Sequence, residues 1–198
     1  MDSDIDFHIP DCDEFRNGYE AYNREIRNGT VYFEALSTIS ENWGNPAAMA
    51  KGIQLLLRSW HPRYSNVDLD RLAECINSNS QILNEFRERN ILSLKDSDNE
   101  AVEKIYHHFH GALARRGDNK KSDTSAGKAL SLLSTHFFPL WDNEIYYEYV
   151  RYRFYCDFMI KMKILAEHVK DYVPNPDDRS LLKRIDEYNY SKYTKQWI

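Results

Sequence analysis

One aspartate of this chain stands where a carboxylate could do chemistry. Asp142 follows the apolar segment 137–141 and comes at the point where a new helix must begin. An aspartate there accepts hydrogen bonds from the free backbone N–H groups of the first helical turn. Because Trp141 and Tyr146 flank it in the sequence, the same carboxylate would lie at a helix end that is partly shielded from water. There it could face a cation that develops in a reaction. The pattern leaves two interpretations open, a structural helix cap and a catalytic group.

A lysine upstream of Asp142 is a second candidate. Lys128 follows Ser125, Ala126 and Gly127, whose small side chains let the backbone of another segment come close. The Lys128 ammonium could reach a cleft, or it could pair with a carboxylate on the surface of its own helix.

The segment 124–142 resembles the signature half of the helix-hairpin-helix DNA glycosylases. Residues 124–133 correspond to the second hairpin helix, and an apolar loop containing Pro139 leads from it to Asp142. The resemblance implies that Asp142 stabilises the sugar oxocarbenium ion, or activates water, as an N-glycosidic bond breaks. It also implies two helical lobes flanking a cleft with Asp142 at its floor. On this hypothesis Lys128 and Tyr146 bind substrate, and Trp141 stacks on a base.

A wider resemblance covers most of the chain. An uncharacterised group of bacterial proteins carries a lysine, a leucine-rich helix and then Phe-x-x-Trp-Asp. This chain is similar in three places, which are Lys128 with the segment ending at Asp142, Leu57-Arg58-Ser59-Trp60, and Ile185-Asp186-Glu187-Tyr188-Asn189. This second resemblance implies no activity.

Two departures from the glycosylase pattern bear on the mechanism. The turn at 115–123 contains the single glycine Gly117, where a helix-hairpin-helix has two glycines that lie two residues apart. Lys128 also lies roughly one helical turn after the place of the Schiff-base lysine in bifunctional members, and Thr124 is nearer to it. We therefore expect a degenerate hairpin and the monofunctional route.

The charge distribution limits the kind of nucleic acid that the chain could bind. A formal net charge of −5 argues against gripping a long duplex through overall charge. Basic residues nevertheless gather in the predicted hairpin turn, where a phosphate would be held. The candidate backbone contacts are Arg115, Arg116, Gly117, Lys120 and Lys121. A solvated loop that binds nothing would have the same composition. The weak basic character of the chain favours a small or single-stranded substrate over a long duplex.

Composition indicates one globular unit. The 198 residues, 42% of them hydrophobic, suit a single compact domain 1–198, either undivided or built of two lobes at about 1–97 and 98–198. Cys12, Cys75 and Cys156 are widely separated and read as reduced thiols. The N-terminus is acidic and no apolar run approaches 18 residues, so we expect a soluble, cytoplasmic protein with no membrane partner.

Helical spacing of apolar residues predicts an all-α fold with no strand. The expected helices run from Asp11 or Asp13 to Ile26, from 30 to about 39, and over 46–60, 68–77, 80–90, 98–113, 125–135, 142–173 and 180–190. The 98–173 region is thus helix, turn, helix, apolar loop and one long helix that starts at Asp142. The residues predicted for the core are Leu56, Trp60, Ile105, Phe109, Leu130, Leu133 and Phe138.

No metal or cofactor is predicted. His107 and His110 share a helix with Glu103 at a spacing that suits metal ligands. A second ligand cluster is missing from the sequence, and closed zinc sites need four ligands. Phosphate-binding glycine loops of the Walker or Rossmann type are missing as well.

Two functions remain. The first is an N-glycosidase with Asp142 as the catalytic carboxylate, acting on a modified base in DNA or RNA or on a nucleoside. The alternative is a non-catalytic helical module that keeps the glycosylase-like fold and binds a nucleic acid or a protein. The sequence leaves the oligomeric state open.

Overall fold

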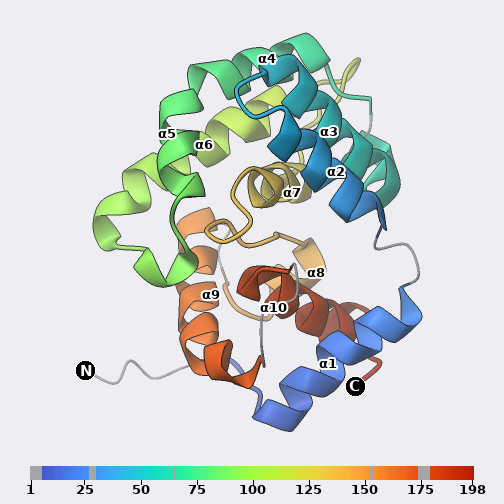
Figure 1. Cartoon of the computed structure of the whole chain (residues 1–198), viewed down its shortest axis with the longest axis vertical. Helices are drawn as coiled ribbons and strands as arrows, with labels where there is room; N and C mark the ends of the chain where they lie inside the picture. Colours follow the sequence, from blue (N-terminus) through green and yellow to red (C-terminus); the bar gives the residue numbers. More distant parts are fainter. Residues whose placement is uncertain (1–5, 27–29, 65, 152–153, 174–178) are drawn as a thin grey trace.

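A computed structural model describes residues 6–26, 30–64, 66–151, 154–173 and 179–198. Within these ranges the regular structure is entirely helical, which confirms the all-α prediction (Figure 1). The α-helices are α1 (Cys12–Glu25), α2 (Thr30–Glu41), α3 (Pro46–Trp60), α4 (Leu69–Ser78), α5 (Ser80–Arg87), α6 (Asn99–Ala112), α7 (Asp123–Leu133), α8 (Asn143–Tyr146), α9 (Tyr155–Val169) and α10 (Leu181–Asn189). A π-helical segment, Tyr190–Thr194, extends α10.

Short polar side chains begin the helices where the sequence predicts. Asp11 accepts from the backbone N–H of Glu14, so it caps α1 in preference to Asp13. Asn45 caps α3 ahead of Pro46, and Ser180 caps α10. Each cap satisfies a backbone donor that has no partner inside its helix. The predicted stop signal at 28–29 lies outside the described residues.

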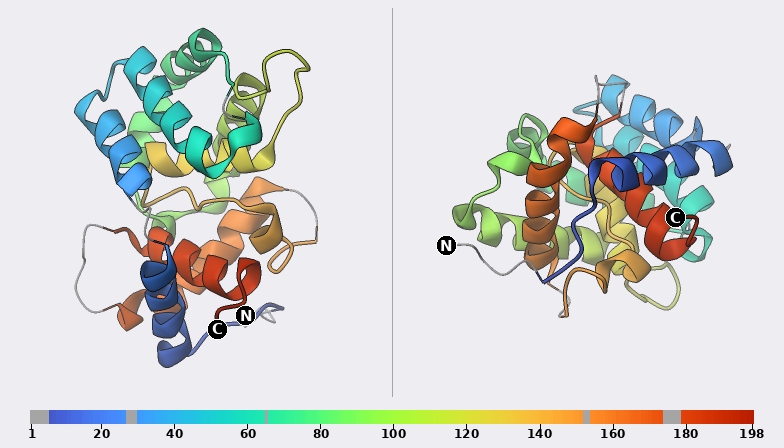
Figure 2. Two further views of the ribbon diagram at one scale, coloured as in Figure 1. Left: turned by 90° about the vertical axis from the view of Figure 1, so that its right-hand side faces the viewer. Right: turned by 90° about the horizontal axis from the view of Figure 1, so that it is seen from below.

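Helix α7 runs through the middle of the fold. Figures 1 and 2 show α2 to α6 at one end of the molecule and α1, α9 and α10 at the other, with α7 between them. Every residue from Thr124 to Leu133 is buried. Although α1 opens the chain, it packs on α10 near the C-terminus. The division into lobes at about residue 97 stays a prediction.

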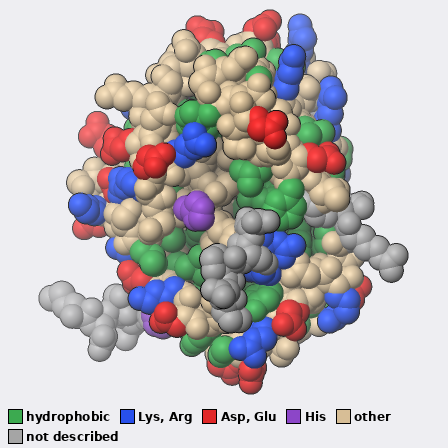
Figure 3. All heavy atoms as spheres, viewed as in Figure 1, with side chains coloured by type: hydrophobic (Ala, Val, Ile, Leu, Met, Phe, Trp, Pro, Cys, Tyr) green, Lys and Arg blue, Asp and Glu red, His purple; other side chains and the backbone are tan. Residues whose placement is uncertain are grey.

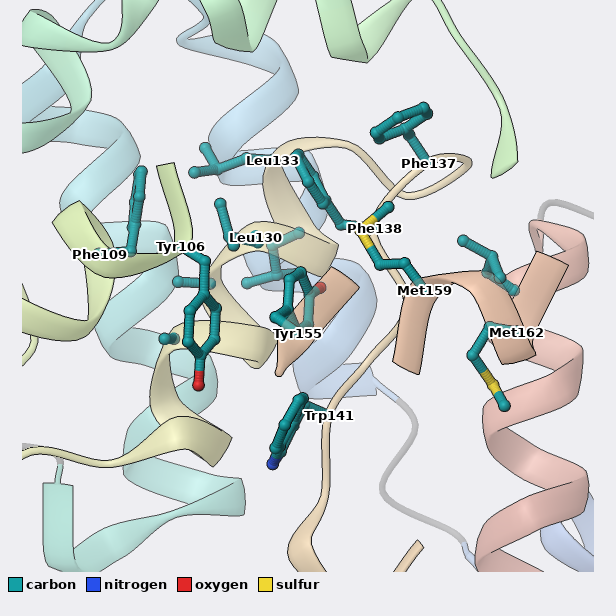
Figure 4. Packing of buried hydrophobic residues seen from close by; sticks show 14 of the residues in the cluster. Tyr106, Phe109, Leu130, Leu133, Phe137, Phe138, Trp141, Tyr155, Met159 and Met162 are labelled. Carbon is teal, nitrogen blue, oxygen red and sulfur yellow. The ribbon is translucent and has the colours of Figure 1, made fainter. Parts of the chain in front are cut away.

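The core gathers around α7 and the loop that follows it. Figure 4 shows Leu130 and Leu133 of α7 facing Phe109 of α6 and Phe138 of the loop. The predicted core residues are buried, with one exception. Trp60 is only partly buried and packs against the core, because it lies in a cavity wall described below.

The prediction of one long helix from Asp142 to residue 173 is wrong. The chain forms the short α8, turns, and begins α9 at Tyr155. Tyr146 and Tyr155 both pack on Trp141, with ring centroids 4.0 and 5.6 Å from its ring. In one straight helix these two tyrosines would lie two and a half turns apart, on opposite faces. The chain must therefore change direction between them, and tertiary packing overrides the local helical pattern.

Candidate functional site

A cavity of about 310 Å³ brings Asp142 and Lys128 together. Its walls come from α1, α3, α7, α8, α10 and the segments beside them, so elements distant in sequence form it. The lining residues are Tyr22, Ile26, Ser59, Trp60, Lys128, Leu140, Asp142, Ile145, Asp186 and Tyr190. A larger, more open cavity of about 900 Å³ adjoins it and shares Tyr22, Ile26 and Trp60.

Asp142 is the N-cap of α8, as the sequence predicts. Its Oδ1 accepts from the backbone N–H of Glu144 at 3.1 Å. Among the described residues no hydrogen-bond donor reaches the second oxygen, Oδ2. The residue is partly exposed and lines the cavity. One carboxylate oxygen is thus fixed by the backbone, while the other is available to a ligand.

Lys128 points from α7 into the same cavity. Its Nζ donates to the backbone carbonyl of Trp60 at 3.0 Å, and the ammonium lies 5.8 Å from the Trp60 ring centroid. Burial lowers the pKa of Lys128, and the negative charges of Asp142 and Asp186 oppose that shift. The amine therefore lies in the cavity, bonded to a backbone carbonyl and near enough to two carboxylates to feel their charge.

Gly127 explains how α7 delivers Lys128 to this place. A Cβ added to Gly127 would lie 2.4 Å from the Cβ of Trp141 and 3.0 Å from its backbone nitrogen. Only a glycine lets α7 touch the loop this closely. Because Asp142 is the next residue in that loop, the contact sets Lys128 and Asp142 against the same cavity.

The sequence reasoning missed Asp186 as a site residue. Its carboxylate lines the cavity, and Oδ2 accepts from Lys183 Nζ at 2.7 Å. The Lys183 ammonium is buried among the rings of Tyr22, Tyr32 and Trp60, at 4.6, 5.3 and 5.2 Å from their centroids. Burial opposes the charged form, but Asp186 and other nearby groups raise the pKa of Lys183. The one sequence signal for Asp186 was the C-terminal segment in the wider resemblance.

Trp141 and Tyr146 do not line this cavity. Both are fully buried and stack on each other, with centroids 4.0 Å apart and planes at 21°. The Trp141 indole donates to Asn143 at 3.2 Å. Their rings support the loop beneath Asp142, and the aromatic surfaces in the cavity wall are instead Tyr22, Trp60 and Tyr190.

The basic turn lies outside the cavity lining as well. Arg116, Gly117, Lys120 and Lys121 are exposed, whereas Arg115 pairs with Asp118 inside the turn. Gly117 has a φ of +106°, a conformation that favours glycine. Phosphate binding by these five residues stays a prediction. On the face shown in Figure 3, acidic and basic side chains are interspersed.

His61, next to Trp60, gives the site region a pH dependence. Its Nε2 lies 3.1 Å from Ser122 Oγ, and its ring stacks on Tyr64 with centroids 4.8 Å apart. Burial and the charge of Lys128 lower the pKa of His61 to about 4. An unfolded chain protonates histidine near pH 6.5, so unfolding takes up a proton in this window. This contribution to stability is present above about pH 6.5 and is lost as the pH falls toward 4.

We therefore expect the free energy of unfolding to fall less steeply in His61→Gln than in the wild type between about pH 7 and pH 5. Urea titrations of both proteins at several pH values measure this. Parallel profiles would contradict the assignment of the shift to His61.

Two of the three histidines of α6 lie beside carboxylates, and the third, His108, contacts Asn79. His107 Nε2 lies 3.5 Å from Glu103, and His110 Nε2 lies 3.3 Å from Asp123. Across the described residues no group of three or more His, Cys, Asp or Glu side chains is placed to hold a metal ion.

No protein-family model, curated protein or solved structure matches the chain. None of the described helices has the length and apolar character that crossing a membrane requires.

Proposed function

We propose that the protein is an N-glycosidase, which hydrolyses the bond between a base and its sugar in a nucleoside or in a modified nucleotide of DNA or RNA. The observation that carries the proposal is the shared cavity of Asp142 and Lys128. Asp142 has the aspartate's place in the segment that resembles the glycosylases, and Lys128 lies in the same segment, about one turn after the place of the Schiff-base lysine. Two different elements bring them to one cavity. On this proposal the cavity is the cleft between two lobes, and the turn at 115–123 is a degenerate hairpin.

The chemistry assigned to Asp142 follows from its position. The C1′–N bond breaks, the electron pair leaves with the base, and the base takes up a proton. Positive charge then develops on the sugar ring, and the fixed carboxylate of Asp142 stabilises it more strongly than it stabilises the substrate. Water adds to C1′ and loses a proton, which gives the free sugar from a nucleoside or an abasic site in a strand.

The cavity supports a substrate group of limited size. About 310 Å³ is near the lower end of the range for small-molecule sites. A free nucleoside, or one nucleotide displaced from a strand, suits that volume. The rings available to stack on a base are those of Trp60, Tyr22 and Tyr190, in place of the predicted Trp141 and Tyr146. Widely spaced cysteines favour a reducing compartment, and we place the reaction in the cytoplasm.

Lys128 offers a second route at the same site. A buried lysine with a lowered pKa has a larger neutral fraction, and a neutral amine can bond to C1′ as the C1′–N bond to the base breaks. The nitrogen then loses a proton, the C1′–O4′ bond opens with a proton taken up at O4′, and the imine so formed is reduced by borohydride to a stable cross-link. Because Lys128 lies about one turn from the Schiff-base position, we expect no cross-link to form, and Lys128→Ala to reduce base release only in part. A borohydride cross-link in the wild type that is missing in Lys128→Ala would contradict the hydrolytic route.

The experiment that tests the function itself is a screen for released base. Purified protein is incubated with a panel of modified nucleosides and single-stranded oligonucleotides, and free base is measured by chromatography. We expect at least one member of the panel to lose its base. If none does, the non-catalytic binding module becomes the better interpretation, with Asp142 only capping α8.

A further inference from the structure

We infer that Asp186 accepts a hydrogen bond from the 2′-hydroxyl of the substrate's sugar, so that the site takes ribosyl rather than deoxyribosyl compounds. The inference rests on the proposed function and narrows its substrate class. The resemblance to DNA glycosylases does not suggest it.

The contacts of Asp186 leave one oxygen for a ligand. Oδ2 accepts from Lys183 Nζ at 2.7 Å. Within the described part of the chain, no donor reaches Oδ1. The residue is only 8% exposed, and it lines the cavity that holds Asp142 and Lys128. The second carboxylate oxygen is therefore the one that a hydrogen-bond donor of a ligand in the cavity can reach.

Lys183 makes Asp186 a fixed group. The Lys183 side chain is only 5% exposed, and its ammonium is surrounded by the rings of Tyr22, Tyr32 and Trp60. A second carboxylate oxygen, Oε1 of Glu187, lies 3.7 Å from Lys183 Nζ. Held from behind in this way, the Asp186 carboxylate loses little rotational freedom when a ligand binds. This pre-ordering favours specific recognition over a loose charge contact.

The cavity is lined both by aromatic rings and by charged groups. Tyr22, Trp60 and Tyr190 provide aromatic surface that suits a flat base. Lys128, Asp142 and Asp186 provide the charged groups, and the two carboxylates act on the same Lys128 ammonium. Asp142 must face C1′ to stabilise the cation, and we place Asp186, the other carboxylate of the lining, against the same sugar. The hydroxyl nearest to C1′ in a ribosyl compound is the 2′-hydroxyl.

A carboxylate at this hydroxyl also aids the reaction. A hydrogen bond from the 2-hydroxyl strengthens as the oxocarbenium ion forms, which lowers the barrier in glycoside hydrolysis. A bound deoxyribosyl compound would cover the Asp186 oxygen without giving it a donor. Sites built around a hydroxyl reject analogues that lack it, by as much as about 10⁴-fold in the strongest cases.

The test uses a probe that does not depend on the unknown base. Iminoribitol, a cyclic amine with the hydroxyls of ribose, imitates the sugar cation, and its 2-deoxy analogue lacks only the hydroxyl in question. Binding of both is measured by isothermal titration calorimetry. We expect the wild type to bind iminoribitol at least about tenfold more tightly than the analogue. In Asp186→Ala the two affinities are expected to agree within about threefold.

Glu34→Gln is the matched control, because Glu34 is an exposed carboxylate in the wall of the larger cavity only. It removes one negative charge and should keep the wild-type preference. Asp186→Asn, whose amide oxygen can still accept from Lys183, replaces Asp186→Ala if the latter does not fold, and should weaken the preference.

Failure of the 2′-hydroxyl contact and failure of the N-glycosidase function give different results. Binding that requires Asp142 but ignores the 2-hydroxyl overturns the inference and leaves the proposed function standing. A wild-type preference that Asp186→Ala retains overturns the role of Asp186. If the wild type binds neither probe, the proposed function loses its support and the inference falls with it.

Discussion

Replacing Asp142 with asparagine is expected to abolish base release and leave the fold nearly unchanged. Asparagine caps a helix as well as aspartate does, so the bond from the Glu144 N–H to residue 142 can persist. The amide carries no charge to stabilise an oxocarbenium ion. We expect a fall in rate of at least about 100-fold, the lower end of what removal of one transition-state contact costs. Initial rates and melting temperatures of the two proteins, measured side by side, check this.

Asp142→Ala separates the capping role from the catalytic one. It removes both the charge and the cap, so it should lose base release and also about 0.5–2 kcal/mol of stability. A protein in which asparagine keeps full activity, while alanine only lowers the melting temperature, would leave Asp142 as a helix cap and nothing more.

Among the glycine-to-alanine substitutions, each of which adds one methyl group, Gly127→Ala is expected to lower stability most. The new Cβ would sit 2.4 Å from the Cβ of Trp141, closer than two carbons can lie without bonding. Either α7 or the loop must move, and overpacking of this kind costs about 1–3 kcal/mol. Since that loop carries Asp142, we also expect base release to fall. Urea denaturation and the base-release rate measure the two effects.

Gly111→Ala provides the control within α6. A Cβ at Gly111 would meet no atom within 4 Å. Alanine is the better helix former, so this variant should gain up to about 1 kcal/mol. If Gly127→Ala were as stable as Gly111→Ala, the close contact of α7 with Trp141 would not be what positions the site.

The sequence predicts those parts of the fold that depend on neighbouring residues. Asp11, Asn45 and Ser180 cap helices because a short side chain meets the first turn of its own segment. The apolar spacing of α6 identifies its buried face for the same reason, whereas α7 is buried on every side, which the spacing does not reveal. The end of the helix after α8 depends on the rings of Tyr146 and Tyr155 both packing on Trp141. Helical spacing cannot reveal such contacts.

In the candidate site, too, the sequence predicts residues of one segment and misses a residue that tertiary contacts bring in. Asp142 and Lys128 could be found from a motif within one segment. Asp186 could not, because it reaches the cavity from α10 and is fixed by Lys183, whose ammonium lies among rings from α1, α2 and α3. Trp141 was expected at the cavity surface because it adjoins Asp142. Neighbouring residues at a helix start point in different directions, and Trp141 faces the core.

The most direct test of the N-glycosidase proposal is the product balance for the best substrate of the panel. Wild type and Asp142→Asn are incubated with it at equal concentrations, and both the free base and the sugar product are quantified, the latter as free sugar for a nucleoside or as abasic sites for an oligonucleotide. We predict that the wild type forms base and sugar product in equal amounts, and that Asp142→Asn forms neither above the rate of the uncatalysed reaction. Equal release by the two proteins, or base released without the matching sugar product, would contradict hydrolysis by Asp142.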